Sequence, residues 1–130
     1  MLYAGGPPLY GVSFTDLNTG TVVGSNGLIL RTTDGGATWK PQSSGTSVLL
    51  TAVSFTDPNT GTVVGGNGTI LRTTDGGAIW TPQPVGTTVQ FTIVVFTSVN
   101  TGFVLGSKGT IRRTTDGGAT WNLQSSATRI

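Results

Sequence analysis

Five aspartates are the side chains of this sequence best suited to acid–base or metal chemistry. The 130 residues include no His and no Cys, and all five acidic side chains are Asp. Without His the chain lacks the commonest general base and transition-metal ligand. Without Cys it has no thiolate nucleophile, thiolate metal site or disulfide. The carboxylates belong to Asp16, Asp34, Asp57, Asp75 and Asp116. Two carboxylates that flank a glycosidic bond can hydrolyse it, so the positions of these residues decide whether such chemistry is available.

Three of the aspartates occupy equivalent positions in a repeated octad. The octads are Thr32–Trp39, Thr73–Trp80 and Thr114–Trp121, and each begins Thr-Thr-Asp-Gly-Gly-Ala. Paired glycines favour a tight turn, and an Asp in such a turn can accept hydrogen bonds from its own backbone. An active site needs only one copy of a catalytic group, so three identical copies indicate a structural role.

The other two aspartates also lie in predicted turns. Asp16 and Asp57 are each followed two residues later by Asn, and the third equivalent position is Ser98. Asp and Asn side chains stabilise turns by bonding nearby backbone. One carboxylate per loop is also a poor set for Ca²⁺, which takes six to eight oxygens. We therefore predict no enzymatic activity, no cofactor and no specific metal.

A period of 41 residues runs through the chain. Phe14, Phe55 and Phe96 keep this spacing, as do the octads. The period divides the chain into an N-terminal extension, 1–7, and three units, 8–48, 49–89 and 90–130. Each unit contains at least five Gly or Pro residues and lacks a helical stripe. The second unit has four short strand patterns, at about 51–56, 61–65, 69–74 and 78–82. Four antiparallel strands form a meander, and radial meanders form a propeller. The predicted fold is all-β, with three four-stranded antiparallel β-propeller blades in one domain.

The octads resemble the Asp-box, Ser/Thr-x-Asp-x-Gly-x-x-Trp, of the bacterial neuraminidase repeat. The fuller unit, VxFTDxNTGxVVGxxGTILRTTDGGATW, is similar to the photosystem II stability/assembly factor propellers over about residues 9–130. This resemblance implies a propeller fold and a role as a non-catalytic protein-interaction scaffold. The residues expected to build the structural boxes are Thr32, Asp34, Gly36, Trp39, Thr73, Asp75, Gly77, Trp80, Thr114, Asp116, Gly118 and Trp121.

The resemblance to sialidases stops at the box. That family uses an arginine triad, an acidic Asp, and a Tyr nucleophile with a Glu partner. Here Glu is absent, and the only tyrosines, Tyr3 and Tyr10, lie near the N-terminus. Its catalytic residues therefore cannot be carried over to this sequence.

Three blades form an open arc, whereas closed propellers have about four to eight. An isolated arc would expose an apolar sheet face at each end. We therefore predict a homodimer that closes a six-bladed ring. The alternatives are a ring of three chains and a chain that is one piece of a longer protein.

The third unit is more basic than the other two. Arg112 stands where the earlier units have Leu30 and Leu71, and Lys108 stands where they have Asn. With Arg113 and Arg129 these residues form a candidate patch for an acidic partner or anion. The alternative is sequence drift, or charges that protect a sheet edge. The aligned series that ends in Arg113 is expected to pack its stems on a neighbouring sheet and leave its heads in water.

The composition limits the classes of partner that this chain is expected to bind. The net charge is +2 and 9% of residues are charged, which predicts neither nucleic-acid nor membrane-surface binding. No apolar stretch approaches the ~20 residues that span a bilayer, so no membrane insertion is expected.

We predict a protein partner at the loops around Ser25–Gly27, 43–47, 66–67, 84–88 and 107–109. A multivalent carbohydrate-binding lectin and an amplified or engineered repeat with no evolved ligand are the alternatives. The sequence indicates no compartment.

Overall fold

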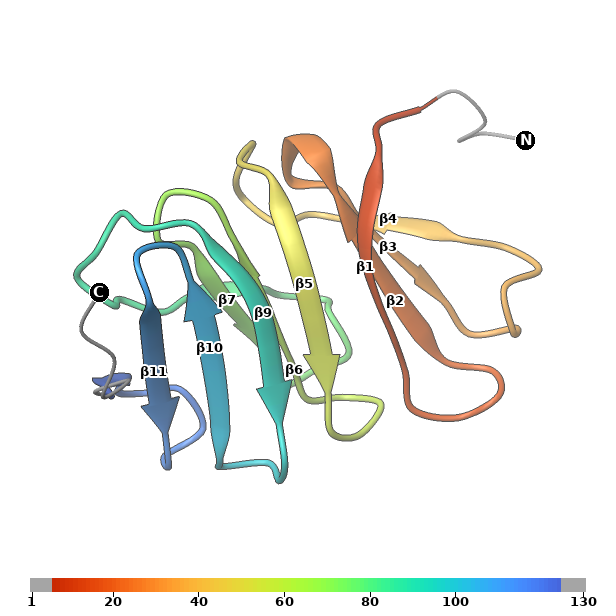
Figure 1. Ribbon diagram of the computed structural model, residues 1–130. Coiled ribbons are helices and arrows are strands. Elements are labelled where there is room, and N and C mark those ends of the chain that lie inside the picture. The colour runs from red at the N-terminus through yellow and green to blue at the C-terminus, as the bar shows by residue number, and fades with distance from the viewer. Residues whose placement is uncertain (1–5, 125–130) are drawn as a thin grey trace.

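The computed structural model describes residues 6–124, which form three four-stranded antiparallel sheets (Figure 1). Each sheet is a meander whose strands pair in chain order. The first contains β1 (Leu9–Phe14), β2 (Gly20–Gly24), β3 (Ile29–Thr32) and β4 (Lys40–Gln42); the second contains β5 (Leu50–Phe55), β6 (Gly61–Gly65), β7 (Ile70–Thr73) and β8 (Thr81–Pro82); the third contains β9 (Phe91–Phe96), β10 (Gly102–Gly106), β11 (Thr110–Thr114) and β12 (Asn122–Leu123). Within 6–124 the helical structure is the short 3₁₀ turn η1 (Ser25–Gly27). The predicted all-β architecture of three blades is confirmed, and we call the sheets blade 1, blade 2 and blade 3.

The blades stand face to face in an arc. Strands β1, β5 and β9, the first of each sheet, lie side by side across the arc (Figure 1). Side chains alternate along each strand, so each blade has two faces. We call the face toward the following blade the leading face and the other the trailing face. Val23 and Ile29 on the leading face of blade 1 pack with Leu50, Val63 and Trp80 of blade 2.

The same packing recurs one blade later. Val64 and Ile70 of blade 2 pack with Phe91, Val104 and Trp121 of blade 3. The core therefore lies between the sheets, and no sheet has a core of its own. This explains why the strands carry apolar residues on both faces.

The repeated Phe is positioned by a glycine on the neighbouring strand, whose lack of a Cβ leaves room for the ring. In blade 2, Phe55 pairs across the strands with Gly61, and a Cβ on that glycine would lie 2.5 Å from the Phe55 ring. The ring therefore lies flat on the glycine. It meets Trp80 edge-on, with centroids 5.9 Å apart at 87°. The repeat keeps Phe, Gly and Trp in phase because the three side chains form one packed unit.

The fourth strand is shorter than expected. The pattern predicted a strand at about 78–82, but β8 contains only Thr81–Pro82. The Ile79 N–H donates to the Asp75 carboxylate at 3.1 Å, which keeps this residue in the turn. The division of the chain into 1–7 and three units is compatible with these strands, but its boundaries stay a prediction. Residues 1–5 of the extension lie outside the described part.

Candidate functional site

The carboxylates of the three octads are bound inside their own turns. In blade 1, the Thr32 hydroxyl donates to Asp34 Oδ1 at 2.8 Å and accepts from the Gly36 N–H at 2.9 Å. The Thr38 N–H donates to Oδ1 at 2.9 Å, and its hydroxyl to Oδ2 at 2.6 Å. Blade 3 repeats this set with Asp116 and Thr120. The aspartates thus stabilise turns, and the assignment of these turns to the Asp-box stays a prediction.

Hydrogen bonds to the ionised form lower the pKa of all three carboxyls. The pKa of Asp34 falls to about 2, chiefly through the Thr38 hydroxyl. That of Asp116 also falls to about 2, chiefly through the Thr120 hydroxyl. The pKa of Asp75 is lowered mainly by the backbone N–H of Ile79, which has no hydroxyl. Groups that stay ionised at neutral pH are unsuited to general acid catalysis.

Asp16 and Asp57 occupy the predicted second type of turn. Asp16 accepts from the N–H groups of Asn18 at 2.7 Å and Thr19 at 2.9 Å. Asp57 accepts equivalent bonds in blade 2, and the Ser98 hydroxyl accepts from the Thr101 N–H in blade 3. Within 6–124, no three Asp side chains gather into a group that could hold a metal ion.

The tryptophans of blades 2 and 3 are buried between sheets. Trp80 and Trp121 are each 6% exposed. Their indole N–H groups donate to Gln42 at 3.2 Å and to Gln83 at 3.3 Å, both on the preceding blade. Neither ring is free to stack on a sugar. The pairing with Gln was not predicted, although Gln recurs at the 41-residue spacing.

The repeated arginines bridge successive blades. Arg31 donates to the carbonyl of Pro58 at 2.6 Å, and its guanidinium lies 5.4 Å from the centroid of Phe55. Arg72 bonds Val99 at 2.9 Å and lies 5.2 Å from Phe96. The heads of Arg31 and Arg72 thus bond the next blade at its exposed edge, and the expectation that the heads of this series are solvated stays a prediction.

The basic residues of blade 3 do not gather on one face. Lys108 is exposed in the β10–β11 turn. Arg112 lies half-buried on the trailing face and donates to the carbonyl of Trp121 at 3.3 Å. Arg113 lies on the leading face, 5.6 Å from the centroid of Phe103. Arg129 is outside the described residues. Anion binding by this set stays a prediction.

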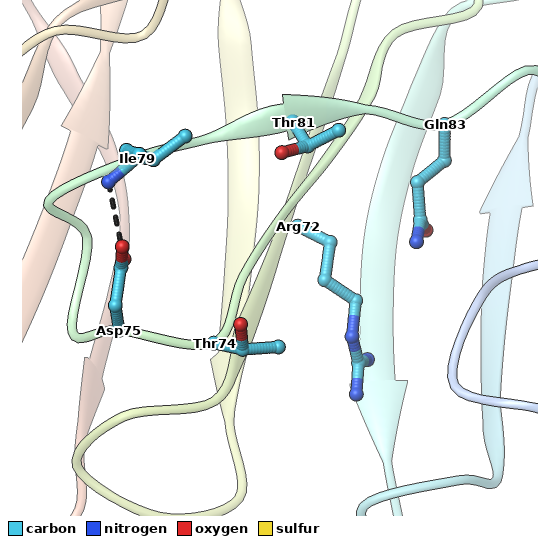
Figure 2. A pocket seen from close by; sticks show the side chains of 6 residues that line it. All are labelled: Arg72, Thr74, Asp75, Ile79, Thr81 and Gln83. Carbon is cyan, nitrogen blue, oxygen red and sulfur yellow. Dashed lines mark hydrogen bonds between the residues drawn. The ribbon is translucent and has the colours of Figure 1, made fainter.

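Grooves lie on the surface of the part of the chain that the structure describes, and they differ in place and lining. A rim groove of about 330 Å³ lies on the outer part of blade 2 (Figure 2). It is lined by Arg72, Thr74, Asp75, Ile79, Thr81 and Gln83, and blade 1 has an equivalent groove of about 220 Å³. The charged groups of the rim groove already form hydrogen bonds within the chain, since Arg72 bonds the next blade and Asp75 bonds its own turn.

A larger groove opens between blades 1 and 2 at the loops expected to meet a partner. This loop-face groove measures about 370 Å³. The loop 44–46 forms one wall, and Gly68 and Thr69 form another. Ile70, Leu71, Trp80, Pro82 and Gln83 complete its lining. Its lining combines apolar side chains with backbone-rich loops, a mixture typical of ligand pockets.

The loop wall is held in place by its own blade. The Ser44 hydroxyl donates to the carbonyl of Gly27 at 2.7 Å, and the Gly27 N–H donates to the carbonyl of Val48 at 2.7 Å. These bonds fix the loop against η1. The groove is therefore formed before any partner binds.

Residues 6–124 contain no helix with the length and apolar character needed to cross a bilayer. No protein-family model matches the chain, and no curated protein matches it.

Among solved structures, the chain is similar to YCF48 bound to a D1 peptide. The TM-score is 0.81 and the identity 30%, over 90% of this chain and 39% of that one. It is also similar to YCF48 from Cyanidioschyzon merolae, with a TM-score of 0.79 and 29% identity over the same shares. These structures confirm the propeller fold and the resemblance to photosystem II stability/assembly factor propellers. The chain spans 39% of the length of these YCF48 chains.

Proposed function

We propose that this chain is a non-catalytic scaffold that binds an extended peptide segment of a partner protein. One observation carries the proposal: the chain shares 30% identity and a TM-score of 0.81 with a YCF48 structure that holds a D1 peptide. The Asp carboxylates are hydrogen-bonded inside their own turns, which supports a role other than catalysis. In this proposal the octad residues stabilise the blades and take no part in chemistry.

The loop-face groove is the proposed binding site. Its lining includes the buried apolar side chains of Ile70, Leu71 and Trp80. A peptide side chain that enters would lie against Pro82, which is exposed beside this buried core, while peptide N–H and C=O groups would face the polar loop 44–46. The rim groove is the weaker candidate because its charged groups are already bonded.

A titration with a synthetic D1 peptide tests the proposal. Binding should change the tryptophan fluorescence, since Trp80 lines the groove. Thr69→Arg fills the groove and should weaken binding by about tenfold or more, the effect of losing ~1.4 kcal/mol. Thr74→Arg, in the rim groove, is the matched control and should bind normally. A scrambled peptide that binds equally well would contradict the proposal, and loss of binding in Thr74→Arg alone would move the site to the rim groove.

We also propose that two copies of the chain close a six-bladed ring. The support is the arc of three blades, whose end faces keep apolar side chains such as Val12, 62% exposed, and Ile93, 50% exposed. Light scattering tests this part separately. A species with twice the mass of the chain is expected, and a monodisperse monomer would contradict the ring.

A further inference from the structure

Both internal contacts between blades use one set of polar bonds. From the leading face, an Arg donates to a turn carbonyl of the next blade and covers its Phe ring. A Gln from the end of the blade accepts the indole N–H of the next Trp. A Ser accepts a backbone N–H: Ser13 from Phe55 at 3.0 Å and Ser54 from Phe96 at 3.2 Å. We call this set, with the apolar core around it, the seam.

Blade 3 carries the leading-face half of another seam. Arg113 and Gln124 align with Arg31 and Gln42 after two periods of 41. Arg113 is exposed and lies over Phe103 of its own sheet. The Gln124 amide bonds only the nearby Asn122 carbonyl, at 3.4 Å, among the described residues. Both residues thus occupy the positions from which Arg31 and Gln42 reach a following blade.

Blade 1 carries the matching trailing-face half. Its trailing face has Phe14 and Trp39, which align with Phe55 and Trp80, and the two rings already meet edge-on with centroids 6.1 Å apart. Leu17 aligns with Pro58, whose carbonyl Arg31 binds. Val12 is 62% exposed, whereas its equivalents Val53 and Val94 are 8% and 7% exposed under the preceding blade. This face therefore lacks only a neighbour to become a third internal-type contact.

We propose that the leading face of blade 3 docks on the trailing face of blade 1 of a second copy, head to tail. In this seam Arg113 donates to the carbonyl of Leu17 and covers Phe14, while Gln124 accepts the indole N–H of Trp39. The inference rests on the proposed six-bladed ring and specifies how it closes. Each ring contains two such seams, related by the twofold axis.

The seam between copies is more apolar than the internal ones. Ile93, Val95 and Phe103 replace the Ala52, Ser54 and Thr62 of blade 2. Val95 cannot accept the N–H that Ser54 accepts. The internal fit is tight, because a Cβ on Gly11 would lie 3.0 Å from the Ala52 Cα, and Ile93 takes the position equivalent to Gly11. The seam between copies is therefore wider at its inner strands, and it exchanges a hydrogen bond for apolar contact.

Two variants test the seam. Val12→Lys places a charge in the contact, but the exposure of Val12 leaves the fold of one chain intact. The dissociation constant of the dimer should rise by about 100-fold or more, since two seams each bury an unpaired charge. Arg113→Glu should have the same effect from the opposite face. Ile79→Lys is the matched control, because Ile79 is similarly exposed, at 66%, but lies on the rim of blade 2. Circular dichroism checks that each variant is folded.

Mixing the two variants tests the head-to-tail direction. Each variant alone should be monomeric, because both seams of its ring are damaged. In a mixed dimer one seam joins two unaltered faces, so an equimolar mixture should regain a dimer by light scattering. A folded Val12→Lys chain that still dimerises would overturn the seam but leave the ring proposal standing. Folded variants that fail to dimerise when mixed would overturn the head-to-tail contact, and a monomeric wild type would overturn the ring and the seam together.

Discussion

The octad of blade 2 differs from the other two at one position, and that difference sets the pKa of its carboxyl. Asp34 and Asp116 each accept a hydroxyl at 2.6 Å, from Thr38 and Thr120. Asp75 has Ile79 at this position and accepts from it only the backbone N–H, at 3.1 Å. Ile79→Thr should therefore add the missing bond and lower the pKa of Asp75 further, as the Thr38 and Thr120 hydroxyls do for the other two carboxyls. Ile79 is 66% exposed, so the change removes little apolar packing.

Carboxyl ¹³C chemical shifts followed by NMR during an acid titration measure this change. Thr38→Val is the matched reverse experiment, since it keeps the shape and removes the hydroxyl, and it should raise the pKa of Asp34 from about 2. A folded-state pKa below the ordinary 3.8 stabilises the protein above that pH. The stability gained in Ile79→Thr should thus be full near neutral pH and disappear as the pH falls through the lowered pKa of Asp75 in acid. An unchanged pKa of Asp75 in Ile79→Thr would refute the hydroxyl as the cause.

Two further substitutions probe the contacts between blades and within loops. Gln42→Leu removes the partner of the buried Trp80 indole and should reduce the free energy of unfolding by about 1–3 kcal/mol. Urea unfolding measures this, and adding Trp80→Phe should recover much of the loss; a double-mutant coupling near zero would argue against the bond. Gly68→Ala and Gly45→Ala both place Ala at positive φ, +69° and +76°, but only at Gly68 would the new Cβ meet a carbonyl, that of Thr87 at 1.9 Å. Gly68→Ala should be the more destabilising by at least ~1 kcal/mol, and equal losses would show that backbone strain alone decides.

The fold was predictable because its signals are local and repeated. The Asp-Gly-Gly turn, the Asn-Gly turn and the short β-branched runs each specify a piece of one blade, and the period of 41 counts the blades. The turn role of Asp34 followed from the same local chemistry. The point where this turn ends in blade 2 was not predictable in the same way. The Ile79 N–H donates to Asp75, so the turn includes Ile79 and the last strand is shorter than its composition indicates.

The contacts between blades could not be predicted from the sequence pattern. The Trp80 indole meets Gln42 from 38 residues away, and Arg31 meets Pro58 from 27 residues away. Both depend on how two sheets pack, which no local pattern encodes. The recurrence of Gln at the period was a usable signal, but Gln has no motif that assigns it a partner. The candidate basic patch could have been tested from strand geometry, since Arg112 and Arg113 are adjacent in a strand and adjacent side chains point to opposite faces.

The two proposed contacts of this chain use different surfaces, so they should be independent. The loop-face groove is lined by loops 44–46 and 68–69 and by the outer strands of blade 2. The seam uses the end faces of blades 1 and 3, around Val12 and Arg113. A peptide in the groove would touch neither end face, and ring closure would cover neither wall of the groove. Val12→Lys should therefore leave the affinity for the D1 peptide unchanged, and Thr69→Arg should leave the dimer intact. Coupling between the two sites would mean that closing the ring changes the spacing of blades 1 and 2, since those two blades alone form the groove and one of them also forms the seam.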